Sequence, residues 1–205
     1  AVQNAEYNWW GDPTGPQHPT LNSGGLGNDV SDNVDFDPWL TGNIVCEPDP
    51  EYLTAGATSK TIAVKYLGGA SAPLYGYSIK FSWDGSIVST STAHVTEGTI
   101  LTDLGNTFFW KEPGANEITI DSALLGAIDG ATGPGTLFTV DFTGLDVGTS
   151  DIDITILNAR DRYNVDLVGI AEDDGLLIVD VDVPTVTDVE IENLLIFYSP
   201  RAELV

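Results

Sequence analysis

The chain has 205 residues and carries 31 Asp and Glu against 7 Lys and Arg, a formal net charge of −24. A chain of this length forms about one or two domains, and its acidity excludes a nucleic-acid partner bound through the phosphate backbone. Such charge either serves solubility or, where carboxylates cluster, provides the oxygen ligands that calcium prefers.

The sequence begins at Ala1 and contains no Met. This favours a secreted, mature chain whose leader was cleaved before a small residue. No run approaches the roughly 18 apolar residues that a membrane span needs. We therefore expect a secreted or cell-surface protein with no membrane span.

Residues 1–45 are rich in Gly, Asn, Asp and Pro and show hardly any apolar alternation, which predicts an irregular segment. A solvated linker rarely carries many aromatic residues. This segment carries the large rings Tyr7, Trp9, Trp10, Phe36 and Trp39. We expect these rings to pack against the rest of the chain or against a neighbouring molecule.

The single cysteine, Cys46, excludes an internal disulfide. It is either an idle buried thiol or one half of a bond between two chains.

From Thr61 onward, β-prone runs alternate with turn residues, which predicts a β-sandwich or barrel. The predicted strands are Thr61–Leu67, Leu74–Trp83, Ile87–Ser89, Thr107–Trp110, Ile118–Leu125, Thr136–Thr143, Ile152–Leu157 and Leu176–Val183. The best helical signal, Ser122–Ile128, is too short to form a stable helix alone.

Two of these runs alternate clearly. The first places Tyr75, Tyr77, Ile79 and Phe81 on one face. The second places Leu137, Thr139 and Asp141 opposite Phe138, Val140 and Phe142. Each strand is therefore expected to have an inner and an outer face.

Residues 184–205 form a separate tail after Pro184, and we expect it to be a β-strand. Its apolar side chains are Val186, Val189, Ile191, Leu194, Leu195, Ile196, Phe197 and Tyr198. A β-prone run at a chain end is an aggregation hazard unless it is paired or covered. This tail is therefore predicted to have a partner.

Residues 52–183 resemble the cohesin family, the protein-binding modules of cellulosomes and of many surface proteins. Three stretches carry the resemblance: Leu74–Asp84, Thr96–Leu101 with Phe108–Trp110 after it, and Gly135–Phe142 with Gly148–Leu157 after it. Asp174–Gly175 before Leu176 resembles the turn into the closing strand. The resemblance implies an all-β jelly-roll β-sandwich that binds other proteins and catalyses nothing.

The stretches Asn8–Pro16 and Asp32–Leu40 resemble the closing turns of parallel β-helix domains in secreted proteins. Such domains stack many coils, and a single coil cannot bury its own face. This resemblance again predicts that the N-terminal rings contact the sandwich or another molecule.

Candidate chemistry is sparse. His18 and His94 stand outside any metal-ligand pattern, and the carboxylates show no recognisable catalytic arrangement, so we expect no enzyme. Calcium is a possible cofactor at two acidic groups, of which one is Asp29, Asp32, Asp35 and Asp37 and the other is Asp161, Asn164 and Asp166. Glu172, Asp173 and Asp174 form a third, weaker group, and each group has a solvated acidic loop as its alternative.

Three functions stay open. The first is a structural subunit that binds copies of itself through its terminal segments, by strand donation into a neighbour and in open filaments. The second is a cohesin-type module for a dockerin-like partner. The third is a carbohydrate-binding module with exposed rings. Trp83 and Trp110 lie within predicted strands, however, and we expect them in the core.

Overall fold

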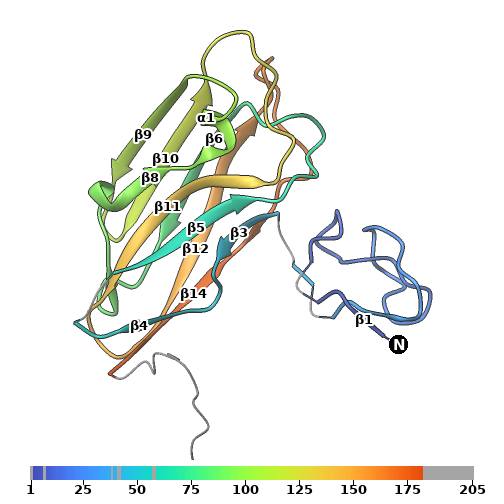
Figure 1. The fold of residues 1–205 in the computed structure, drawn as a ribbon, viewed down its shortest axis with the longest axis horizontal. Coiled ribbons are helices and arrows are strands. Elements are labelled where there is room, and N and C mark those ends of the chain that lie inside the picture. Colours follow the sequence, from blue (N-terminus) through green and yellow to red (C-terminus); the bar gives the residue numbers. More distant parts are fainter. Residues whose placement is uncertain (1, 7, 38, 41–42, 57–58, 182–205) are drawn as a thin grey trace, which may run out of the picture.

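The computed structural model describes residues 2–6, 8–37, 39–40, 43–56 and 59–181 (Figure 1). Most of these residues form two β-sheets that we call sheet I and sheet II. The strands of sheet I are, in spatial order, β4 (Glu51–Thr54), β14 (Gly175–Asp180), β12 (Gly148–Arg160), β6 (Gly76–Ser82), β10 (Glu117–Leu124) and β9 (Thr107–Pro113).

Sheet II packs against sheet I. Its strands are β13 (Glu172–Asp173), β3 (Ile44–Glu47), β5 (Lys60–Tyr66), β11 (Gly135–Gly144) and β7 (Val88–Ser89), and β8 (Val95–Glu97) also pairs with β11. Two short helices, η1 (Thr92–His94) and α1 (Thr99–Thr102), lie in the connection from β7 to β9. Within the described residues, no helix has the length and apolar content needed to cross a membrane.

The core lies between the inner faces of the two sheets. In β6 the side chains of Tyr77, Ile79 and Phe81 are buried, as the alternation of the sequence predicts. Phe81 stacks on Phe138 of the facing sheet, with ring centroids 5.7 Å apart. The predicted all-β jelly-roll sandwich is confirmed. The strand β10 runs to Leu124 and so includes the start of the stretch Ser122–Ile128, which had the best helical signal.

Two bulges interrupt the alternation of inner and outer residues. The pairing of β11 with β5 shifts register between Thr136 and Phe138. Leu137 and Phe138 are consequently both buried, so the prediction that Leu137 faces away from Phe138 is wrong. A similar shift between Ile156 and Asn158 in β12 puts Ala159 on the buried side, where strict alternation from Ile152 and Ile154 would turn it outward, because a bulge adds one residue to one strand of a pair.

At the start of the sandwich the chain crosses from one sheet to the other. β3 belongs to sheet II and β4 to sheet I, and both precede the first predicted strand at Thr61. Pro48 and Pro50 lie between them. Because proline has no backbone N–H to donate, these residues end one ladder and let the chain change sheets.

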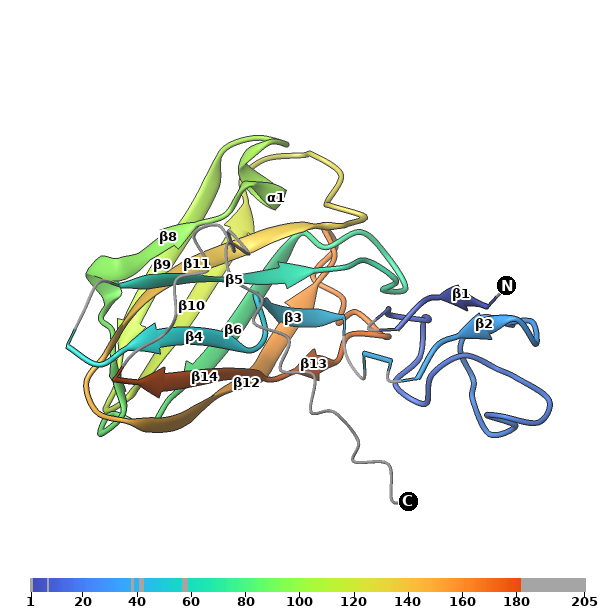
Figure 2. The same ribbon diagram turned by 60° about the horizontal axis from the view of Figure 1, so that its bottom comes forward.

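A buried amide, Asn43, ties three segments together at the start of β3. Its Nδ2 donates to the carbonyl oxygens of Gly68 and Gly169 at 2.7 and 2.8 Å, and its Oδ1 accepts from Ala171 N at 3.0 Å. Asn43 is fully buried. It therefore fixes the loops at the end of the sandwich that faces the N-terminal segment (Figures 1 and 2).

Candidate functional site

The outward side chains of β9, β10, β6 and β12 form a continuous surface of sheet I, which we call the four-strand face. Residues opposite one another across a ladder share a face, so the register defines rows from β9 to β12. The rows are Phe108, Ala123, Gly76, Arg160; then Trp110, Asp121, Ser78, Asn158; then Glu112, Thr119, Lys80, Thr155; and then Glu117, Ser82, Asp153.

The first row contains a hollow of about 320 Å³. Its middle positions are Ala123 and Gly76, whose side chains are too short to fill the space between Phe108 and Arg160. A Cβ on Gly76 would lie 3.0 Å from Ser122 O and 3.1 Å from the Ala123 Cβ. The hollow is therefore a consequence of small residues in adjacent strands, and its exposed wall is mainly apolar.

Two aromatic rings of β9 are exposed on this face. Phe108 is 50% exposed and Trp110 is 56% exposed, whereas Phe109 between them packs against the core. The prediction that Trp110 is a core residue is wrong, because the pairing with Asp121 puts Trp110 in the outward row of β9, at the edge of sheet I. Trp83 does pack against the core, with its ring 5.7 Å from Phe81 and 6.0 Å from Phe142.

The basic side chains of this face are already paired. Lys80 Nζ lies 3.4 Å from Glu117 Oε2, and Arg160 Nη2 lies 3.1 Å from Asp166 Oδ1. At the rim of the hollow, Arg162 donates to Asp129. The guanidinium and ammonium groups here are therefore neutralised by carboxylates of the same chain.

Several acidic side chains of the face have no such partner. The carboxylates of Glu112, Asp121 and Asp153 make no hydrogen bond or ion pair with any other described residue. Beyond the fourth row, a second hollow of about 390 Å³ is lined by Asp84, Asp151 and Asp153 among others. The face thus changes from apolar at the first row to acidic at the fourth.

Beneath the face, Tyr77 is a buried phenol. Its hydroxyl donates to Leu137 O at 2.8 Å, and burial, the largest effect, raises the pKa of Tyr77 above its ordinary value. Tyr77 therefore stays neutral and joins the two sheets, so its role is structural.

Solved structures similar to this chain are cohesin modules. A non-cellulosomal cohesin from the archaeon Archaeoglobus fulgidus has a TM-score of 0.53 and 16% identity, and the match covers 67% of this chain and 90% of that one. The seventh ScaB type I cohesin from Pseudobacteroides cellulosolvens has a TM-score of 0.55 and 13% identity, with 70% and 94% covered. The sandwich has the cohesin fold.

A type I cohesin–dockerin complex from Clostridium thermocellum matches with a TM-score of 0.53 and 12% identity, covering 67% of this chain and 98% of the matched chain. No family model and no curated protein sequence matches the chain. At such low identities the likeness establishes the cohesin fold of the sandwich.

The N-terminal segment lies at one end of the cohesin-fold sandwich, beyond the start of β3 (Figure 2). Its only described strands are β1 (Gln3–Asn4) and β2 (Val34–Asp35), which pair in parallel. Phe36 is buried in this segment, with its ring 6.2 Å from that of Trp39. Gly15, at φ +78°, leaves room for Trp39, since a Cβ there would lie 2.3 Å from the indole.

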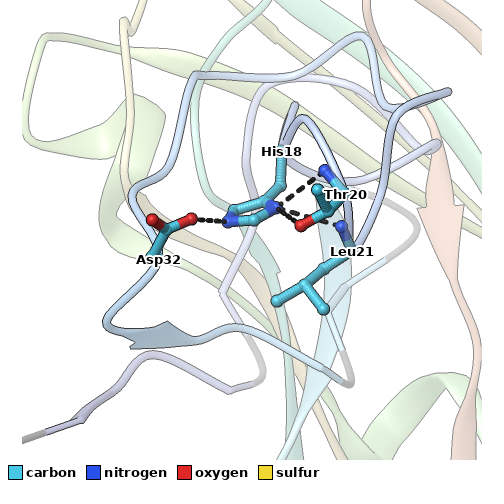
Figure 3. Close-up of polar contacts among 4 residues, drawn as sticks. All are labelled: His18, Thr20, Leu21 and Asp32. Atoms are coloured by element: carbon cyan, nitrogen blue, oxygen red, sulfur yellow. Dashed lines mark hydrogen bonds and ion pairs between the residues drawn. The ribbon is translucent and has the colours of Figure 1, made fainter.

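His18 completes this small core, with its ring 5.9 Å from that of Phe36. Its Nδ1 accepts from Thr20 N at 3.2 Å and from Leu21 N at 3.0 Å, while its Nε2 lies 3.1 Å from Asp32 Oδ1 (Figure 3). Because Nδ1 accepts from two backbone N–H groups, the ring proton lies on Nε2. His18 is thus a structural residue.

Trp9 connects the N-terminal segment to the cohesin-fold sandwich. A Cβ on Gly69 would lie 3.1 Å from Trp9 Nε1, and Trp9 lines a groove of about 740 Å³ together with Cys46 and Lys65 of the sandwich. Trp10 is half-buried beside it. These contacts account for Trp9 within one chain, while the predicted assembly role of the N-terminal rings stays a prediction.

Cys46 is a free thiol, buried in the cohesin-fold core. Burial, followed by the charges of Asp49 and Asp174, raises the pKa of Cys46. The thiol is thus buried within one chain, and a bond between two chains stays a prediction.

The predicted calcium ligands occupy several different positions. Asp32 contacts His18, Asp35 lies in β2, and Asp37 is exposed. Asp29 forms a parallel bridge with Gln17. In the described part of the chain, no three His, Cys, Asp or Glu side chains are grouped so that they could hold a metal ion.

The second predicted calcium group lies in the loop after β12. Asp161 Oδ1 accepts from Tyr163 N and Val165 N at 2.8 and 2.9 Å, Asn164 has φ 62°, and Asp166 pairs with Arg160. These contacts shape the loop, and calcium binding stays a prediction. Tyr7 and the predicted tail residues 186–198 lie outside the described residues.

Proposed function

We propose that this chain is a non-catalytic protein-binding module of the cell surface or extracellular space, and that the four-strand face is its binding surface. The observation that carries the proposal is the pair of half-exposed rings, Phe108 and Trp110, beside the first-row hollow. Aromatic residues are enriched in protein interfaces, where they fill pockets of the partner or frame pockets for it.

The structural neighbours support a protein partner. Several of them were solved with a bound dockerin, including the Clostridium thermocellum complex and the sixth cohesin of Acetivibrio cellulolyticus scaffoldin B. A dockerin-like protein is therefore the first class of partner to test.

The test is site-specific photo-cross-linking. A photoreactive phenylalanine analogue replaces Trp110 in one variant and Thr139 in a matched control, since Thr139 faces outward from β11 on sheet II. Each variant is incubated with a protein extract of the source cells. We expect cross-linked protein only from position 110, and equal yields from both positions would contradict the proposed surface.

Self-association through the terminal segments is the second candidate. Among the described strands, β4 pairs only with β14 and β9 pairs only with β10, so each presents a free edge to which a donated strand can add. Deleting residues 186–205 tests this role. If the tail joins copies of the chain, light scattering should give an oligomer for the full chain, whose monomer mass is 21.8 kDa, and a monomer for the shortened chain. Particles that look unchanged by electron microscopy after the deletion would exclude strand donation by the tail.

A carbohydrate partner would use the same face. If the native chain binds to a glycan array and Trp110→Thr does not, the partner is a sugar that stacks on the exposed rings and not a protein.

A further inference from the structure

We infer that the partner of the four-strand face is a basic polypeptide segment, with an apolar side chain that enters the first-row hollow and Lys or Arg side chains that lie over the acidic rows. The inference rests on the proposed function and specifies the chemistry of its partner.

The hollow is the site for the apolar side chain of the partner segment. Phe108 and Ala123 form its apolar side, and the missing side chain of Gly76 leaves its floor open. Arg160 and Arg162 line the opposite rim, but each already pairs with a carboxylate of this chain. An apolar side chain fits this space without displacing either ion pair.

The unpaired carboxylates are the sites for the Lys or Arg side chains of the partner segment. Asp121 lies in the second row, Glu112 in the third and Asp153 in the fourth. Successive rows are two residues apart, so they lie about 7 Å apart along the strands. A segment anchored in the hollow therefore meets a carboxylate in each of these rows, about 7, 14 and 20 Å from its anchor as measured along the strands.

The rest of the molecule favours the same sign of charge. The chain as a whole carries −24, and the remaining described lysines, Lys60, Lys65 and Lys111, contact Glu51, Glu47 and the Val95 carbonyl respectively. An acidic segment would approach against this field, whereas a basic one is attracted to it.

The experiment uses two 14-residue helical peptides with the same Leu anchor. One carries Lys four and eight residues after the Leu, about 6 and 12 Å along the helix, and the other carries Glu at both positions. Each is titrated into the full ¹⁵N-labelled chain and followed by NMR. We expect the basic peptide to shift the amides of Gly76, Asp121 and Ala123 and to bind about tenfold more tightly than the acidic one.

A matched pair of variants tests the carboxylates. Glu112→Gln/Asp121→Asn removes two charges from the face and should weaken the basic peptide about tenfold. Asp35→Asn/Asp37→Asn removes two charges from the N-terminal segment and should leave binding within about twofold. Raising the salt from about 0.05 to 0.5 M should weaken binding to the native chain, because salt screens exposed charges.

The outcomes separate this inference from the proposed function. Equal binding of both peptides on the four-strand face would overturn the charge inference and leave the proposed face standing. Shifts confined to sheet II would count against both. Absence of binding by the basic peptide would overturn the inference, while position 110 cross-linking would still report on the face.

Discussion

Replacing Trp110 with Thr should separate binding from stability. Trp110 is 56% exposed, so a little less than half of its surface is covered. For a large aromatic side chain that is about 100 Å², or about 2.5 kcal/mol at roughly 25 cal/mol per Å². This figure is an upper bound, because the unfolded chain also covers part of the ring.

Threonine keeps the β-propensity of the position and part of the covered contact. We therefore expect Trp110→Thr to lower the free energy of unfolding by about 1 to 2 kcal/mol. Phe81, by contrast, has no exposed surface, and Phe81→Ala should cost about 3 to 5 kcal/mol because it opens a cavity. Both values come from urea unfolding followed by circular dichroism, with unchanged m-values as the check that the denatured state is the same.

Trp110→Thr should have a larger effect on binding than on stability. A central interface Trp contributes about 2 kcal/mol or more when truncated, which corresponds to about a 30-fold rise in Kd. We expect a loss of this size for Trp110→Thr, measured by calorimetry with the captured partner. A stability loss as large as that of Phe81→Ala, or an unchanged Kd, would refute the assignment of Trp110 to a binding surface.

Three further predictions concern the scaffold and the calcium loops. Asn43→Ala removes the side-chain partner of three backbone groups, of which Gly68 O is buried and the other two are partly exposed. The free energy of unfolding should therefore fall by about 2 to 3 kcal/mol, and a loss below about 1 kcal/mol in urea unfolding would show that water replaces the amide. Burial raises the pKa of Tyr77 above 10.0, so the folded phenol stays protonated where the unfolded one ionises. Its contribution to stability is then complete below pH 10 and declines as the pH rises above 10. Unfolding midpoints between about pH 9 and 11 should therefore fall less for Tyr77→Phe than for the native chain, and parallel curves would contradict this origin. If calcium binds at Asp161 and Asp166, adding it should raise the melting temperature and Asp161→Asn should abolish the rise, whereas an unchanged melting temperature with calcium or chelator would exclude a stabilising site there.

Strand alternation predicted the sandwich well because it reflects burial directly. The row of Tyr77, Ile79 and Phe81 is inside as expected, since a strand between two neighbours can turn only one face to the core. The exception at Leu137 arises from a bulge. A one-residue shift in strand pairing cannot be recognised from the spacing of apolar residues in the sequence.

The candidate site was harder to predict because its rows are set by pairing between distant strands. Both faces of β9 carry aromatic rings, so the rings alone do not show which face is inside. Lys111 is in the same row as Phe109, and a lysine would favour solvent exposure of that row. The structure places that row inward, and Lys111 Nζ reaches past the edge to donate to Val95 O at 2.9 Å. Likewise, Ala123 and Gly76 form a hollow only because β10 and β6 pair in this register.

The most direct test of the four-strand face is hydroxyl-radical footprinting of the chain alone and bound to its purified partner. Oxidation of Phe108 and Trp110 should fall several-fold in the complex, while Tyr52, exposed on β4 at the other edge of sheet I, should react at the same rate in both. Unchanged oxidation of Trp110 in the complex, with protection elsewhere, would contradict the proposed binding surface.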